Sequence, residues 1–194
     1  MSEYISKFNE FKKNISNSYS DELTDLKIEL FFESLEDRSE LYSYEDIFNW
    51  LKNLRNQNEM SISDIPLNSM NDWFYEEKEG KIVHKSGDFF EVIGLRTSIQ
   101  NREVDHGWDQ PFLRQVGFDG GLLGIVRSRL NGIPYYLLEA KFEPGNYGSV
   151  QLSPTLQATF ANINKKHGGR KPHFTDLFLN RDSNSDVKVL FETW

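Results

Sequence analysis

The distribution of glycine and proline divides this sequence into two parts. The first sixty residues contain neither, whereas all 13 glycines and all 6 prolines follow. Both residue types interrupt regular structure, so their absence favours helices, and their recurrence favours short strands joined by turns. The sequence therefore predicts a mixed α+β protein with an N-terminal helical annex at residues 1–60 and a main module at 61–194.

Two apolar stripes at helical spacing predict helices within the annex. The stripes are Leu23, Leu26, Leu30 and Phe31, and, after the N-cap residue Ser43, Ile47, Trp50, Leu51 and Leu54. Packing against the main module is the ordinary role of such a face, and binding of a partner is the alternative. Residues 1–15 are expected to form a frayed helix or an arm that mediates dimerisation.

The main module begins with short strand-like segments. Residues 80–87 and 89–97 predict two strands with a turn at 86–88, and residues 121–130 and 133–143 predict a hairpin. Asn131-Gly132 joins the second pair, and Asn-Gly is a strong hairpin signal because both residues tolerate positive φ. A helix is predicted over 153–169, and a last strand over 187–194.

Charge and cysteine content exclude several classes of protein. The formal net charge is −8, and there is no cysteine. An acidic chain is a poor binder of a phosphate backbone, so no nucleic-acid partner is expected. Disulfide scaffolds and thiolate metal sites are excluded. The sequence contains no membrane span and no signal peptide, so we expect no membrane association and a soluble, cytoplasmic protein.

Polar side chains are concentrated among apolar ones between residues 84 and 162. The amides in this region are Gln110, Asn146, Gln151, Gln157 and Asn162. A buried amide must find hydrogen-bond partners, so amides clustered beside strands often face a polar ligand. This region is the expected location of a functional site.

Five segments of the chain resemble the NDP-hexose 2,3-dehydratase family. They are IPLNSMNDW at 65–73, HKSGDFFEVIG at 84–94, WDQP at 108–111, GLLG at 121–124 and LLEAKFEPGNYGSVQLSPTLQAT at 137–159. The resemblance covers residues 43–192. The last segment is long and unusual in composition, which makes the signal specific.

The resemblance implies a fold and an activity. Members of the family remove water across carbons 2 and 3 of a dTDP-4-keto-6-deoxyhexose in deoxysugar biosynthesis. Their fold is similar to the Nudix superfamily, a mixed sheet with flanking helices. Most members carry two tandem copies of the module, and 194 residues hold one. We therefore expect one complete copy here, and a homodimer that takes the place of the tandem pair.

The proposed chemistry requires neither a metal nor a redox cofactor. The ketone at carbon 4 acidifies the hydrogen on carbon 3, so a base, an acid and donors to the enolate suffice. Nudix hydrolysis instead needs a helix with several glutamates that hold divalent metal. Residues 149–175 contain no Asp or Glu, which argues against metal-dependent cleavage there.

Three residues are the expected catalytic groups. Glu143 and His84 are candidates for proton transfer, and Lys141, two residues before Glu143, would share its face of a strand and aid electrostatically. Each residue also has a structural alternative. Glu143 could form a salt bridge with Lys141 or Arg102, Lys141 could simply be solvated, and His84 could have no role in catalysis.

A second group of residues is expected to bind the nucleotide sugar. Trp108 would stack on the base or ribose, and Arg102 would hold the diphosphate. The remaining members of the group are Gln110, Asn146, Gln151, Thr155 and Gln157. Ordinary alternatives are a core position for Trp108 and a solvated strand face for Arg102.

Two other functions fit the same residues. One is a nucleotide-sugar-binding module without turnover. The other is an isomerase or a different lyase that acts on a nucleotide-linked 4-keto sugar, because such enzymes use the same enolate.

Overall fold

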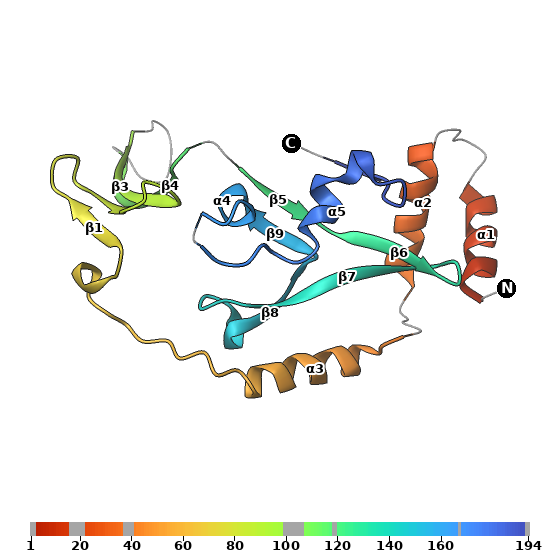
Figure 1. The fold of residues 1–194 in the computed structure, drawn as a ribbon. Helices are drawn as coiled ribbons and strands as arrows, with labels where there is room; N and C mark the ends of the chain where they lie inside the picture. The colour runs from red at the N-terminus through yellow and green to blue at the C-terminus, as the bar shows by residue number, and fades with distance from the viewer. Residues whose placement is uncertain are drawn as a thin grey trace. The chain divides into compact units, whose positions relative to one another are not determined.

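The computed structural model describes residues 3–15, 22–36, 41–98, 107–117, 120–166 and 168–192. They form a mixed α+β structure in which the strand pairs β1–β2, β2–β3, β3–β4, β6–β7 and β7–β8 are antiparallel (Figure 1). This confirms the predicted fold class at the level of mixed helix and strand. No helix in the described ranges is long and apolar enough to cross a membrane.

The contacts divide the chain into two compact units. Unit 1 comprises Met1–Met60, Leu123–Gln157 and His173–Trp194, and unit 2 comprises Ser61–Leu122 and Ala158–Pro172. One boundary coincides with the predicted end of the annex at residue 60. The N-terminal helices nevertheless group with residues 123–157, which the sequence analysis placed in the main module.

Helices α1 (Glu3–Ile15) and α2 (Glu22–Leu35) pack through aromatic rings. Tyr4, Phe8 and Phe11 of α1 surround Phe32, with ring centroids 5.2–5.5 Å from it. Ile133 of the β6–β7 hairpin joins the same core cluster. This core attaches the helices to a strand more than one hundred residues later in the chain.

The predicted apolar stripe on α2 is wrong in part. The buried hydrophobic residues of α2 are Ile28 and Phe32, whereas Leu30 is 42% exposed and Phe31 is 54% exposed. Helix α2 carries apolar residues on more than one side, so the spacing of these residues does not by itself determine which side is buried. The choice is made by contacts with α1 and the β6–β7 hairpin, which bury Phe32.

Helix α3 (Tyr44–Asn56) is confirmed together with its cap. Ser43 and Asp46 form a reciprocal capping box, and the hydrogen bonds from Ser43 lower the pKa of Asp46. Leu51 of the predicted stripe is buried, while Trp50 is 46% exposed. Arg55 donates two hydrogen bonds to the carbonyl of Val150, which attaches α3 to strand β8.

Unit 2 contains a four-stranded sheet in the order β1-β2-β3-β4. Its strands are β1 (Trp73–Glu76), β2 (Lys81–His84), β3 (Phe90–Thr97) and β4 (Trp108–Gln115), and the 3₁₀ helix η1 (Leu67–Ser69) precedes them. The predicted turn between β2 and β3 is confirmed, with Gly87 at φ +71°. Strand β1 was not predicted.

Unit 1 contains the sheet β6-β7-β8. Strands β6 (Val126–Leu130) and β7 (Ile133–Phe142) form the predicted hairpin, with Asn131 at φ +53° and Gly132 at φ +84°. Two positive φ values are typical of the type I′ turn that matches strand twist. Strand β8 (Val150–Pro154) follows the 3₁₀ helix η2 (Tyr147–Ser149) and pairs with β7.

The helix predicted over 153–169 is wrong. Residues 150–154 belong to β8, β9 (Leu156–Thr159) follows, and only α4 (Phe160–Ile163) is helical. The true N-cap is Thr159, whose side chain accepts a hydrogen bond from the backbone of Asn162. Pairing with β7 engages the backbone of residues 150–154, so tertiary structure outweighs the local helix signals at Ser153 and Pro154.

Two other strand predictions need correction. Residues 121–130 form two strands rather than one, because β5 (Gly121–Gly124) pairs with β9 while β6 pairs with β7. Residues 187–192 have no regular structure, since a strand requires a neighbour for its hydrogen bonds and no described strand supplies one. Helix α5 (Thr175–Leu179) and η3 (Arg181–Ser183) were not predicted.

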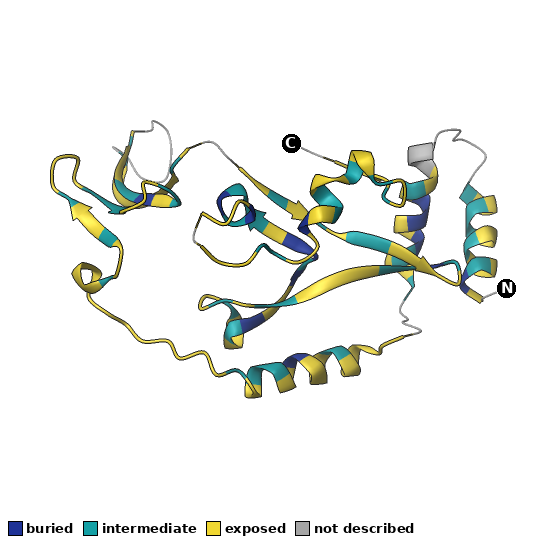
Figure 2. Ribbon diagram, in the orientation of Figure 1, coloured by how far each residue is buried: buried dark blue, intermediate teal, exposed yellow. Residues whose placement is uncertain are grey.

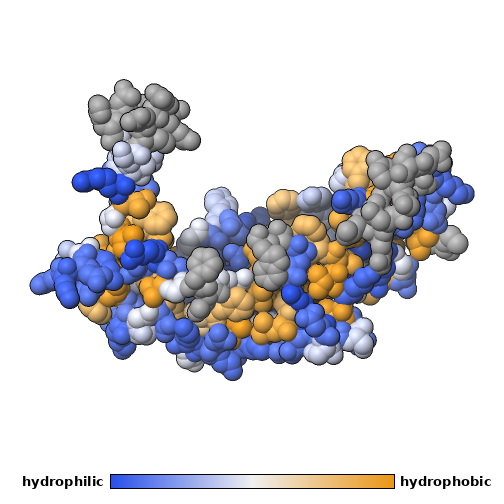
Figure 3. Space-filling model, turned by 90° about the horizontal axis from the view of Figure 1, so that it is seen from above, coloured by the Kyte–Doolittle hydropathy of each residue, from blue (hydrophilic) through white to orange (hydrophobic). Residues whose placement is uncertain are grey.

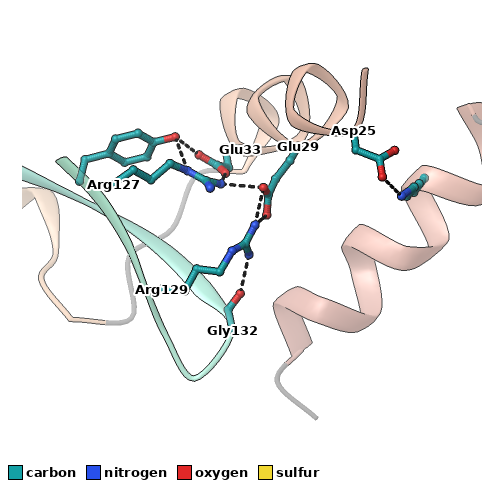
Figure 4. Close-up of polar contacts among 8 residues, drawn as sticks. Asp25, Glu29, Glu33, Arg127, Arg129 and Gly132 are labelled. Atoms are coloured by element: carbon teal, nitrogen blue, oxygen red, sulfur yellow. Dashed lines mark hydrogen bonds and ion pairs between the residues drawn. The ribbon is translucent and has the colours of Figure 1, made fainter. Parts of the chain in front are cut away.

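An ion network joins α2 to the β6–β7 hairpin (Figure 4). Glu29 contacts Arg127 at 2.8 Å and Arg129 at 2.6 Å, and Glu33 contacts Arg127 and the hydroxyl of Tyr136. Burial by itself lowers the pKa of Arg127, but hydrogen bonds to Glu33 and Glu29 outweigh this effect and raise it. Figure 2 shows buried segments in α2, α3, β8 and β9.

The network predicts that replacing one of its arginines lowers the free energy of unfolding much more than replacing an exposed lysine. Arg127→Met removes the arginine that contacts both Glu29 and Glu33, two carboxylates largely withdrawn from water, so we expect it to lower the free energy of unfolding by about 3 kcal/mol. Lys12→Ala breaks only the exposed pair with Asp25, also visible in Figure 4, and should cost less than about 1 kcal/mol. Urea denaturation of both variants measures the two losses of stability. Equal losses would show that the buried network contributes no more than the exposed ion pair.

Candidate functional site

A polar strip runs along one face of strands β7 and β8. The pairing places Lys141 opposite Gln151 and Glu139 opposite Ser153, and directly paired residues point to the same side of a sheet. We call this set of side chains the polar strip: Glu139, Lys141, Glu143, Gln151, Ser153 and Gln157. Four of its six members were expected as site residues from the sequence.

The contacts within the polar strip are centred on Lys141. Its ammonium lies 2.9 Å from the carboxylate of Glu143 and donates a hydrogen bond of 3.2 Å to the carbonyl of Gln157. The hydroxyl of Ser153, in a residue only 7% exposed, donates to the side-chain oxygen of Gln157 at 3.2 Å. The expectation that Lys141 and Glu143 share a face is confirmed, and the salt bridge named as the structural alternative is present.

The other face of the same strands is apolar. Leu138, Phe142 and Leu152 lie on it, and each is 43% exposed. Val150, at the end that α3 covers, is fully buried. The β7–β8 pair is therefore amphipathic, with titratable and amide groups on one side and hydrocarbon on the other.

Asn146 supports the turn that carries Glu143. Its side-chain amide donates to the carbonyl of Lys141 at 3.0 Å, and its backbone N–H donates to the carbonyl of Glu143. The backbone N–H of Glu143 donates in turn to Ser149. These bonds hold the turn between β7 and β8, so Asn146 positions Glu143 by supporting its backbone.

Thr155 has a different environment from that expected of a ligand-binding residue. It is 2% exposed, and its hydroxyl donates to the carbonyl of Leu137 and accepts from the backbone N–H of Val126 at 2.9 Å. A hydroxyl donates one hydrogen bond, and that of Thr155 is already donated to Leu137, so it has no proton left for a ligand. Thr155 therefore connects β6 and β7 to the segment after β8.

A second group of residues surrounds His84 in unit 2. The Nδ1 atom of His84 lies 2.7 Å from the hydroxyl of Ser86 and accepts a hydrogen bond from the backbone N–H of Ser86 at 3.2 Å. Trp73 and Phe89 contact the imidazole edge-on, with centroid distances of 5.2 and 4.9 Å. We call Trp73, His84, Ser86 and Phe89 the histidine cage.

Strand β4 carries two further expected residues. The indole N–H of Trp108 donates to the side-chain oxygen of Gln110 at 3.0 Å, and Trp108 is 41% exposed. The two side chains thus form one exposed surface rather than a core contact. Arg102 lies outside the described residues.

The polar strip and the histidine cage belong to different compact units, and each is held by its own contacts. Four residues of these two groups were not predicted as site residues: Ser153, Ser86, Trp73 and Phe89. If residues 150–154 had been predicted as a strand, the alternation of side chains would have placed Ser153 on the same face as Gln151. Among the residues that the structure describes, no group of three or more His, Asp or Glu is arranged to hold a metal ion.

Comparison with known proteins identifies the class to which this chain belongs. Residues 44–194 match the family model described as NDP-hexose 2,3-dehydratase, and these residues include every expected site residue. The chain belongs to the NDP-hexose 2,3-dehydratase family.

Individual relatives agree with the family match. The chain is similar to dTDP-4-dehydro-6-deoxy-α-D-glucopyranose 2,3-dehydratases of Amycolatopsis orientalis (37% identity, 71% of this chain), Streptomyces violaceoruber (38%, 61%) and Saccharopolyspora spinosa (36%, 68%). The matched segments span only 26–30% of the length of those relatives.

The position of Thr155 predicts a structural rather than a ligand-binding phenotype. Thr155→Val keeps the shape but removes the two hydrogen bonds to Leu137 and Val126, each worth about 0.5–1.5 kcal/mol, so the free energy of unfolding should fall by about 1–3 kcal/mol. Thr155→Ser retains the hydroxyl and serves as the matched control, with a smaller loss. Urea denaturation distinguishes them; a stable Thr155→Val variant would show that the hydroxyl is dispensable for folding.

Proposed function

We propose that this chain acts as a lyase on a nucleotide-linked 4-keto-6-deoxyhexose and removes water across carbons 2 and 3. The observation that carries the proposal is the family match over residues 44–194, within which the polar strip and the histidine cage both lie. The names of the relatives support dTDP-4-keto-6-deoxyglucose as the substrate. The family resemblance further supports a Nudix-like arrangement of the module.

Glu143 is the proposed base that removes the proton from carbon 3. Its carboxylate is about half-exposed and therefore accessible to a ligand. The electron pair released from the C–H bond moves into the ketone and forms an enolate, and a cation stabilises such a charge. Lys141, 2.9 Å from Glu143, is the proposed source of that charge. The enolate then expels the hydroxyl of carbon 2, which leaves as water after protonation.

His84 is the second group to which we assign a role in proton transfer or hydrogen bonding. Its support is the histidine cage, which holds the imidazole from three sides. The proposed binding residues for the nucleotide sugar are Trp108, Gln110, Arg102, Asn146, Gln151 and Gln157. The structure gives Thr155 a role in joining strands, and we therefore leave it out of this set.

A coupled assay tests the activity. The protein is incubated with dTDP-4-keto-6-deoxyglucose and a reductase for the 3-keto product, with and without EDTA. Loss of one water, unchanged by EDTA, is the expected result. Binding without turnover would replace the lyase by a binding module, and diphosphate cleavage that EDTA abolishes would indicate hydrolysis.

Glu143→Gln should lower kcat by about 100-fold or more, which is the contribution of a general base. The amide keeps the size and hydrogen-bonding ability of the side chain, so KM should stay within a few-fold. Glu139→Gln is the matched control, because Glu139 is a glutamate on strand β7, four residues before Glu143, to which no catalytic role is assigned. Equal kcat values for the two variants would remove Glu143 from the mechanism.

We also infer that two copies of the chain associate through the apolar face of β7 and β8. Leu138, Phe142 and Leu152 are exposed there on a regular pair of strands. Figure 3 shows hydrophobic side chains gathered in patches at the surface. Association would remove these side chains from water and supply part of the roughly 800 Å² per partner of a typical stable interface.

Sedimentation tests the association. The unmodified chain should sediment as a dimer, and Leu152→Glu should shift it to a monomer, because a charge in an apolar interface is costly. Leu113→Glu changes a leucine that is 62% exposed on β4 and is the control that should remain dimeric. A stable monomer of the unmodified chain would contradict the inference.

A further inference from the structure

The hydrogen bonds of His84 determine which ring nitrogen carries its proton. A backbone N–H can only donate, and that of Ser86 points at Nδ1 from 3.2 Å. Nδ1 must therefore accept, which places the proton of the neutral ring on Nε2. The hydroxyl of Ser86, 2.7 Å from Nδ1, must also donate to it.

Ser86 is itself held in the orientation that this requires. The backbone N–H of Asp88 donates to the hydroxyl oxygen of Ser86 at 3.1 Å. This bond fixes the position of the hydroxyl oxygen beside Nδ1, and because Nδ1 accepts from the backbone N–H of Ser86, the hydroxyl can contact it only as a donor. Asp88 also pairs with Lys166 at 2.7 Å, so the turn that carries Ser86 is attached to a segment 78 residues later in the same unit.

Nε2 of His84 is the ring nitrogen that the contacts with Ser86 do not engage. Trp73 and Phe89 contact the ring at interplanar angles of 67° and 90°, which limits its rotation. In the part of the chain that the structure describes, Nε2 makes no hydrogen bond. The ring is thus fixed at one nitrogen and carries a free N–H at the other.

Backbone strain beside the imidazole supports a functional reason for this arrangement. Phe89, which contacts the ring, has φ +73°, and Asp72, next to Trp73, has φ +67°. Such values are strained in a residue with a side chain and persist where the surrounding structure enforces them, often at active sites. Here Val116 donates to the carbonyl of Phe89, and Lys85 to that of Asp72.

We propose that Ser86 is a positioning residue that holds His84 as the Nε2–H tautomer, so that Nε2 donates a hydrogen bond to the oxygen of the 4-keto sugar as the enolate forms. The inference rests on the proposed function and assigns His84 within it. His84 acts as a neutral donor and does not take the proton from carbon 3. The proton on carbon 3 is therefore removed by another residue.

Nuclear magnetic resonance tests the tautomer without any need for turnover. Long-range ¹H–¹⁵N spectra are recorded at about pH 8.5, about two units above the reference histidine pKa of about 6.5, so that neutral rings are observed. His84→Gln identifies the His84 signals by their loss. We expect Nδ1 with the shift of an unprotonated nitrogen and Nε2 with that of a protonated one. A protonated Nδ1, or shifts averaged between two tautomers, would overturn the proposal.

Kinetics test the consequence for catalysis. Ser86→Ala removes the shorter of the two contacts to Nδ1 and leaves only the 3.2 Å hydrogen bond from the backbone N–H. We therefore expect the His84 shifts to move part of the way towards the other tautomer, and kcat to fall about tenfold, which corresponds to one hydrogen bond, with KM little changed. Ser86→Thr keeps the hydroxyl and should restore both readouts. Ser183→Ala is the matched control, since it removes a similar turn hydrogen bond, to Asn180, in unit 1.

The outcomes separate this inference from the proposed function. An inactive protein whose His84 has the expected tautomer would contradict the proposed function and the role of His84 in it, while confirming the positioning by Ser86. An active protein in which Ser86→Ala leaves kcat and the tautomer unchanged would contradict the positioning role alone.

Discussion

The register between strands β7 and β8 is the constraint on which the candidate site in unit 1 depends. Side chains alternate along a strand, so a slip by one residue would move every side chain to the opposite face. In the observed register Lys141 lies opposite Gln151, and Phe142 lies opposite Val150. Burial of Val150 and the hydrogen bonds from Arg55 to its carbonyl favour this register over its neighbours.

The same register accounts for the chemistry that the strands can perform. It gathers a cation, a carboxylate and amides on one face, while hydrocarbon occupies the other. An ammonium group beside a carboxylate is suited to a reaction in which a proton leaves carbon and negative charge appears on oxygen. In unit 2, the histidine cage holds an imidazole whose Nδ1 is contacted by the hydroxyl and the backbone N–H of Ser86.

Particular residues show how far the sequence could be interpreted. Asn131-Gly132 predicted the β6–β7 hairpin correctly, because its turn geometry is a local property. Ser43 predicted the start of α3 for the same reason. The helix expected after Ser153 failed, since pairing with β7 is a long-range interaction that local signals do not report. Ser86 was overlooked for a similar reason, because its importance arises from the ring it contacts.

The sequence by itself determined the family, the mixed α+β class, and the shared strand face of Lys141 and Glu143. These follow from residue identity and from spacing along the chain. Only the tertiary structure decided which face of α2 is buried, that residues 150–154 and 156–159 are strands, and which nitrogen of His84 accepts from Ser86. Each of these depends on atoms brought together by folding, either by packing between distant segments or by the geometry of a hydrogen bond within a turn.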